Sequence, residues 1–253
     1  MALFPTKSLQ FRAGGSAGGD YGPDVSHREA LLVLTGIGYG PSGMKAMGRF
    51  HSSFSELDLF VPDYIRKSGI ASSAEAAAQY IDEQKLELYA KVHVFCFIAG
   101  AFIFHDLMQS RPLKNAGLLM LDRSPYQERA PRIVTKRIPW IARTLLGDFV
   151  FQLASRDYPD FQRFSMDTPS IASPALFIEE KRTALMKLFS RECNRMGPIS
   201  WEVDGMASQV ADFCYVPYHH DSIYSNFDQL MPAIRNQIQT GSLGTHVSRQ
   251  PPE

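Results

Sequence analysis

The sequence predicts an α/β protein with a mostly parallel sheet that helices cover on both faces. Short, continuous apolar runs alternate with segments of helical periodicity along most of the chain. One apolar run, at residues 91–96, passes through a tight turn of small residues straight into a helix. A later run ends directly before an aspartate and another ends one residue before a pair of histidines, at the sheet edge where such folds place ligand groups.

Length and composition indicate one domain. The chain has 253 residues, of which 45% are hydrophobic, enough for a single sizeable core. We expect a flexible lead-in at 1–28, a domain at 29–240 and a disordered tail at 241–253. Lys plus Arg and Asp plus Glu both number 26, so the net charge gives no sign of nucleic acid or of an anionic membrane surface as a partner.

The cysteines and the start of the chain predict the compartment. Cys96, Cys193 and Cys214 are an odd number at wide spacings, which indicates buried free thiols in a reducing compartment and neither disulfides nor a zinc site. The first residues lack a charged region followed by an apolar one, and no run approaches the ~18 apolar residues of a membrane span. The prediction is a soluble, cytoplasmic protein with no membrane span, metal or cofactor.

The first half of the chain predicts three strands and three helices. A buried strand at 30–35 leads through a glycine-rich loop at 36–43 into a helix at 44–54. The four glycines of the loop, among them Gly36 and Gly38, could turn backbone N–H groups toward a ligand, although a plain strand-to-helix loop is an equal alternative. A second strand at 57–62, a helix from about Ser72 and the strand-turn-helix segment at 91–108 follow.

The second half contains an insertion between strands. After a strand at 116–121, the residues at 126–173 lose the sheet pattern and include a helix at 139–153, which suggests a helical lid. Strands return at 174–180 and 213–217. Helices are expected at 183–193, between these strands, and at 226–238, after the last strand.

The turn after the strand at 91–96 has the form of a nucleophile elbow. In a G-x-S-x-G elbow the small residues permit a sharp turn, and the central side chain projects over the end of the sheet. Here the five residues are Cys96-Phe-Ile-Ala-Gly100, which puts Ile98 at the position of the nucleophile. An isoleucine side chain cannot lose a proton or attack a carbonyl, so this elbow has no nucleophile.

These segments resemble an α/β-hydrolase, and more narrowly the thioesterase domains of polyketide and nonribosomal peptide synthesis. The resemblance covers about residues 30–240. It rests on the elbow, on Leu118-Leu-Met-Leu-Asp122-Arg-Ser-Pro125 and on Val216-Pro-Tyr-His-His220, with Trp201 as a further similarity. It implies that Asp122 is the acid and His220 the base of a triad, and that the ligand is an acyl or thioester compound, either free or held by a carrier protein. Three positions depart from the family pattern: Ile98, Ala101 and Tyr218.

Each site assignment has an alternative. Asp122 could cap a turn through Ser124 and Pro125. His220 could be a loop histidine paired with Asp221, and His219 would be the base if the register differs by one residue.

Two other residues could supply a nucleophile. Cys96 should lie too deep in the sheet, and a buried thiol is inert. Ser42, in the glycine-rich loop, has no evident reason to lie beside His220.

Two classes of function follow. In the first, Asp122 and His220 act as a base-only catalyst or flank an acyl-binding pocket. The residues expected to line that pocket are Gly36, Ile37, Gly38, Tyr39, Phe97, Ile98 and Ala99. In the second, the chain is a non-catalytic scaffold or regulatory module whose pocket is vestigial.

Overall fold

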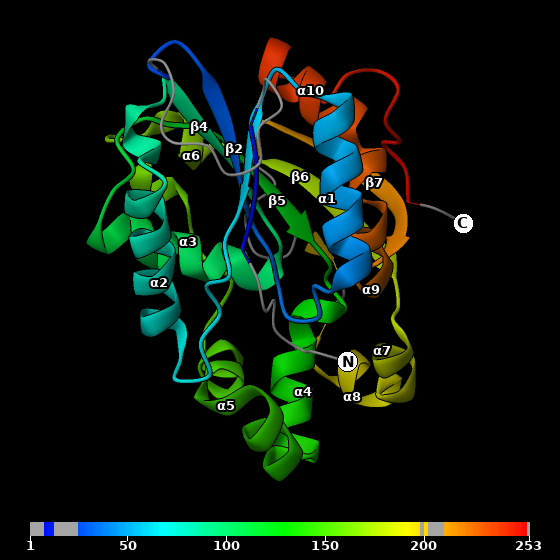
Figure 1. Ribbon diagram of the computed structural model, residues 1–253. Helices are drawn as coiled ribbons and strands as arrows, with labels where there is room; N and C mark the ends of the chain where they lie inside the picture. The colour runs from blue at the N-terminus through cyan, green and yellow to red at the C-terminus, as the bar shows by residue number, and fades with distance from the viewer. Residues whose placement is uncertain (1–7, 13–24, 198–199, 202–209, 252–253) are drawn as a thin grey trace.

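The computed structural model describes residues 8–12, 25–197, 200–201 and 210–251 (Figure 1). Most of the predicted lead-in at 1–28 therefore lies outside the described residues, as do the last two residues of the tail. Seven strands of the described residues form one sheet in the order β1-β3-β2-β4-β5-β6-β7. Among these seven, β1 alone is antiparallel to its neighbour, which confirms the predicted α/β class with a mostly parallel sheet.

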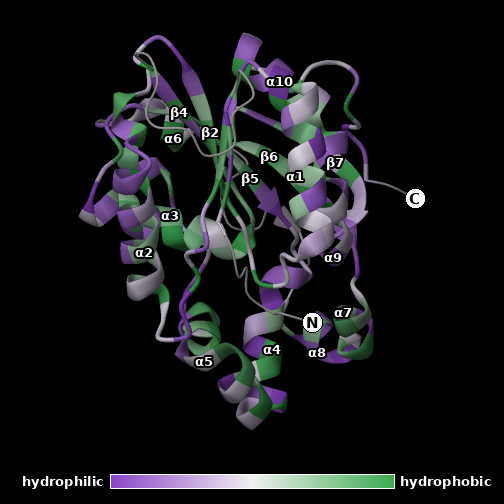
Figure 2. Ribbon diagram, in the orientation of Figure 1, coloured by the Kyte–Doolittle hydropathy of each residue, from purple (hydrophilic) through white to green (hydrophobic). Residues whose placement is uncertain are grey.

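The strands coincide closely with the apolar runs of the sequence, because a strand covered on both faces buries every side chain. Their bounds are β1 Leu9–Phe11, β2 Glu29–Leu34, β3 Asp58–Val61, β4 Lys91–Cys96, β5 Ala116–Arg123, β6 Ala175–Lys181 and β7 Asp212–His219. Figure 2 shows hydrophobic residues concentrated along the central strands.

Alternate residues of each strand face two separate halves of the core. In β2, Leu32 and Leu34 pack with α2 (Ile70–Glu83) and α3 (Ile98–Ser110), while Leu31 and Val33 pack on the opposite face. That face is covered by α1 (Pro41–Ser53) and α10 (Met231–Thr240), as Figure 1 shows. Short helical turns complete the chain: η1 Leu86–Leu88, α9 His220–Ile223 and η6 Tyr224–Leu230.

Residues 126–173 form the helical insertion that the sequence predicts between β5 and β6. Its elements are η2 Gln127–Arg129, α4 Ala130–Arg137, α5 Pro139–Ser155, η3 Gln162–Phe164 and α6 Pro169–Ala172. In Figure 1, α4 and α5 project beyond the carboxyl ends of the parallel strands. Its role as a lid stays a prediction.

Three segments differ from the expectation. β1 lies within the predicted lead-in, where three residues pair with β3. The helix expected at 183–193 is two short helices, α7 Ala184–Leu188 and α8 Ser190–Arg195.

In the predicted tail, Ser248 forms an antiparallel bridge with Tyr215, Arg249 pairs with Asp212, and Leu243 is buried. Residues 241–251 thus contact the body of the protein at three points. No helix of the described residues is long and apolar enough to cross a bilayer.

Candidate functional site

The elbow is a direct transition from β4 to α3. β4 ends at Cys96, Phe97 caps the helix in an extended conformation, and Ile98 is the first residue of α3. The helix lies very close to β2, because a Cβ on Gly100 would be 2.3 Å from the carbonyl oxygen of Leu34. This close packing therefore requires glycine at position 100. Ile98 itself is largely buried and carries no polar group.

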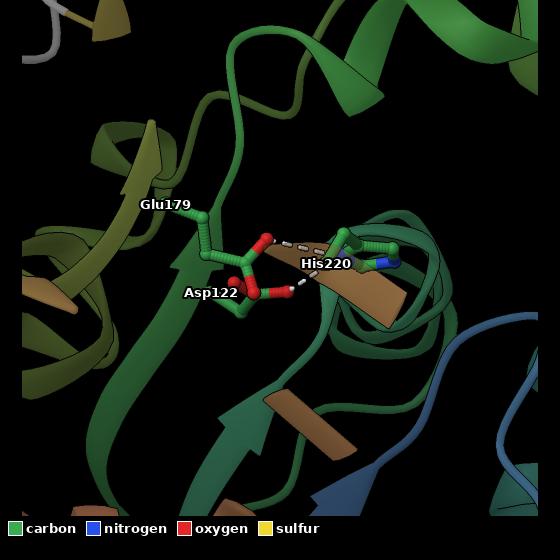
Figure 3. A group of neighbouring side chains, drawn as sticks. All are labelled: Asp122, Glu179 and His220. Carbon is green, nitrogen blue, oxygen red and sulfur yellow. Dashed lines mark hydrogen bonds and ion pairs between the residues drawn. The ribbon is translucent and has the colours of Figure 1, made fainter. Parts of the chain in front are cut away.

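Three ionisable side chains meet at the carboxyl ends of the neighbouring strands β5, β6 and β7 (Figure 3). Asp122 is near the end of β5, Glu179 is near the end of β6, and His220 directly follows β7. The Nδ1 atom of His220 lies 3.3 Å from Oε2 of Glu179, a hydrogen bond, and 3.3 Å from Oδ2 of Asp122. Both carboxyl groups are fully buried.

The structure brings Asp122 and His220 together as the sequence predicts, and it adds Glu179, which the sequence does not single out. Glu179 lies at the carboxyl end of a buried strand, as Asp122 does, and this position is the one signal that could have identified it. Nothing in the sequence distinguishes Glu179 from its neighbour Glu180 at the end of the same strand.

Burial and charge oppose each other at His220. Burial lowers the pKa of the imidazole, but the negative charge of Glu179 and hydrogen bonds to Asp122 and Glu179 raise it more, to about 10. Burial and the neighbouring Asp122 raise the pKa of Glu179 to about 8, against the opposing effect of His220. The imidazole is therefore protonated at neutral pH. Glu179 also keeps its proton to higher pH than an ordinary glutamate, so the groups of this cluster titrate together.

The second nitrogen of His220 is covered by Tyr224. The hydroxyl oxygen of Tyr224 lies 3.4 Å from Nε2 of His220, and the residue is only 3% exposed. The tyrosine ring packs on Phe97 with ring centroids 4.4 Å apart. A Cβ on Gly36 would lie 2.4 Å from the hydroxyl, so only glycine fits there. The phenol of Tyr224 thus fills the space in front of the imidazole.

The alternatives for the base and the nucleophile can be located. His219 is the last residue of β7 and packs at the start of α9 in a capping box with Ser222, so it is His220 that faces the two acids. Burial raises the pKa of Cys96 well above its ordinary value, which keeps the thiol protonated. Ser42 is an exposed residue near the start of α1.

A cavity of about 390 Å³ lies on the other side of the elbow. Its lining combines apolar and charged side chains and includes Ile98, Phe102, Arg129, Arg132, Leu153 and Tyr158. His220 does not line it. The cavity is closed on one side by the elbow helix and on the other by the insertion, and its volume is within the range of small-molecule sites.

Of the residues expected to line a ligand pocket, only Ile98 borders this cavity. Phe97 and Tyr39 are buried in the core around Tyr224. Ala99 is also buried, and Ile37 is half-buried. Gly36 adjoins the Tyr224 hydroxyl, and Gly38 takes a φ of +96°, a conformation that favours glycine. The glycine-rich loop therefore supports the packing around Tyr224 and adds no wall to the cavity.

The three ionisable groups also have the spacing of metal ligands, with ligand atoms within 4.8 Å of one another. With Glu179 keeping its proton, as its raised pKa indicates, one imidazolium balances the charge of Asp122 in this cluster. We therefore interpret Asp122, Glu179 and His220 as an ionic cluster.

We compared the sequence and the structure with those of known proteins. No protein-family profile matches the sequence, and no curated protein matches it. Among solved structures, a lipase of Bacillus licheniformis, BlEst2, is 13% identical with a TM-score of 0.60, covering 90% of this chain and 98% of its own.

Two further solved structures are similar. The NocB thioesterase domain, in a covalent complex with a fluorophosphonate nocardicin G analogue, is 13% identical with a TM-score of 0.51, covering 92% of this chain and 100% of its own. A 1H-3-hydroxy-4-oxoquinoline 2,4-dioxygenase is 14% identical with a TM-score of 0.50, and the match covers 91% of this chain and 100% of the dioxygenase chain. At these identities the likeness is one of fold.

Proposed function

We propose that this chain, which has the α/β-hydrolase fold, binds a small acyl-type ligand beside Ile98 and forms no acyl-enzyme with it. The observation that carries the proposal is Ile98 at the start of α3, where a hydrolase of this kind needs an attacking oxygen or sulfur. The cavity that Ile98 borders gives an apolar ligand a place to bind next to the elbow.

The state of His220 also favours binding over catalysis. A general base must accept a proton, and an imidazole with a pKa of about 10 is already protonated at neutral pH. Its Nε2 atom faces the Tyr224 hydroxyl, and His220 does not line the cavity. In this proposal the cluster around His220 stabilises the end of the sheet.

A base-only catalyst is the second candidate. The pairing of His220 with Asp122 at 3.3 Å favours it, since that pair would orient the ring for proton transfer. The dioxygenase among the similar structures supports it as well, because its name shows that this fold carries reactions other than acyl hydrolysis. In a third candidate, a scaffold or regulatory module, the cavity would have no ligand.

Ligand binding tests the proposal. We expect the fluorescent fatty acid cis-parinarate to bind at one saturable site. Ile98→Trp, which places an indole in the cavity, should weaken binding at least tenfold, while the matched control Leu88→Trp, at an exposed residue outside the cavity, should not. Absence of saturable binding by a panel of acyl ligands would favour the scaffold.

Reactivity separates the two remaining candidates. The wild-type protein should remain unlabelled by a fluorophosphonate probe, and labelling of any serine would contradict the absence of a nucleophile. The wild-type protein and the His220→Gln variant should hydrolyse a short acyl thioester at the same rate. Turnover that His220→Gln removes, without labelling, would establish the base-only catalyst.

A further inference from the structure

The net charge of zero conceals a strongly uneven distribution. Residues 126–147 contain five Lys and Arg and one acidic residue, and residues 181–197 contain the same numbers. Together these two segments hold ten of the 26 cations and two of the 26 acids of the whole chain. The rest of the chain holds the other 16 cations and 24 acids, so the cations are concentrated in these two segments.

The two basic segments lie against each other. Arg137 of α4 pairs with Glu192 of α8. Nη1 of Arg129 donates to the carbonyl oxygens of Cys193, at 2.6 Å, and Gly197, at 3.0 Å. Ala130 and Ile133 share a small apolar cluster with Met186 and Cys193. In Figure 1 these helices lie beyond the carboxyl ends of the strands, and we call this surface the basic end.

Most of the cations of the basic end point into solvent. Eight of the ten are exposed: Arg132, Lys136, Arg137, Arg143, Lys181, Lys187, Arg191 and Arg195. Three of the eight are paired with acids, Arg132 with Asp157, Arg137 with Glu192 and Arg143 with Asp148. The net positive charge of the surface therefore comes from the other five, which are Lys136, Lys181, Lys187, Arg191 and Arg195. The basic end therefore presents a positive field over a broad surface.

Large apolar side chains stand among these cations. Trp140 on α5 is 72% exposed, Leu188 on α7 is 76% exposed, and Leu145 on α5 is 45% exposed. Exposed cations beside tryptophan and leucine are the combination that binds anionic bilayers, because the cations attract the headgroups while the apolar side chains enter the boundary with the acyl chains.

We propose that the basic end is a peripheral docking surface for an anionic lipid bilayer. Nucleic acid or an acidic protein would satisfy the cations, but neither explains why Trp140 and Leu188 extend into solvent from two different helices. The cavity beside Ile98 is lined by Arg129 and Arg132 of the same surface, so a docked protein would hold it near the lipid. The inference does not depend on the proposed function.

Vesicle flotation tests the inference. The wild-type protein should bind vesicles of 70% phosphatidylcholine and 30% phosphatidylserine in 50 mM salt, and neither pure phosphatidylcholine nor the anionic vesicles in 500 mM salt. Lys136→Gln with Lys187→Gln should weaken binding by about thirtyfold, since each basic residue near the surface contributes about a factor of five. The matched control, Lys91→Gln with Lys114→Gln, removes the same charge elsewhere and should leave binding unchanged.

A second pair of variants distinguishes lipid from other polyanions. Trp140→Ser with Leu188→Ser should weaken vesicle binding at least fivefold and leave binding to heparin unchanged, while the control Leu88→Ser should alter neither. Failure of the wild-type protein to bind anionic vesicles would overturn the inference. So would vesicle binding that the loss of Trp140 and Leu188 does not affect, because charge alone would then explain it.

Discussion

His220 lies between two buried carboxyl groups on one side and a phenol on the other, and this enclosure determines what the residue can do. A triad histidine has one acid partner and a free Nε2 that takes the proton of the nucleophile. Here the second acid, Glu179, holds the proton on the ring, and Tyr224 occupies the space in front of Nε2. Restoring a nucleophile alone would leave both obstacles in place.

We therefore expect a serine at the elbow to react only at high pH. In a Tyr224→Ala background, Ile98→Ser should be labelled by a fluorophosphonate probe at a rate that rises from pH 7 toward pH 10, following the loss of the His220 proton. Adding Glu179→Gln should shift the rise to lower pH, and adding His220→Ala should abolish it. A labelling rate that does not change between pH 7 and pH 10 in any of these variants would show that His220 has no role at the elbow.

The same cluster should make folding stability depend on pH. The folded pKa of His220, about 10, is above its ordinary value of 6.5, so its stabilising effect is complete below pH 6.5 and is lost as pH rises through about 10. Glu179, raised from 4.5 to about 8, acts in the same direction because the folded protein keeps its proton longer.

Urea unfolding should show the free energy of unfolding falling between pH 6.5 and 10 by on the order of 5 kcal/mol. In His220→Gln the fall should be clearly smaller, and in His27→Gln, an exposed control, it should match the wild type. A fall of equal size in the His220 variant would contradict the assignment.

At the scale of elements, a bend in α5 is one of the points at which the insertion is fixed to the body. Gly147 takes a φ of 65° in the middle of the helix, and the backbone N–H groups of Asp148 and Phe149 both donate to the carbonyl oxygen of Lys67. A Cβ on Gly147 would lie 2.4 Å from that oxygen. The bend in α5 and the close approach to the Lys67 carbonyl oxygen therefore both require glycine at position 147.

Gly147→Ala should lower the free energy of unfolding by about 1 to 3 kcal/mol, because the new side chain meets both an unfavourable φ and a backbone atom. Gly40→Ala is the matched control, since Gly40 has a negative φ and its nearest neighbour would be 3.8 Å from the new Cβ. Thermal unfolding measures the difference, and equal midpoints for the two variants would argue against the bend.

Elements with strong local patterns could be predicted from the sequence, and long-range contacts could not. The apolar runs located β2 to β7 because each strand is buried on both faces. Asp122 and His220 could be placed near each other because the carboxyl ends of parallel strands share one edge. β1 has three residues and too little pattern to detect, and Tyr224 has no local signal, since its role depends on Gly36 and Phe97 far away in the chain.

At the scale of the whole molecule, the formal net charge hides how the charges are distributed. Summing over the chain cancels the cations of the basic end against the acids of the remainder, so a net charge of zero does not by itself argue against an anionic surface as a partner. Two segments separated by more than 30 residues had to be brought together by the fold before the surface could be recognised.

The last strand of the sheet, β7, has only one neighbouring strand, β6, and its other edge is partly closed by the end of the chain. The backbone N–H of Tyr215 donates to the carbonyl oxygen of Ser248 at 2.9 Å, and Arg249 holds the segment to Asp212. An open strand edge is a template for pairing with another molecule. A variant truncated after Gly241 should therefore self-associate as its concentration rises, which light scattering can measure. In the longer chain, the segment after Gly241 would prevent this association by covering the edge of β7.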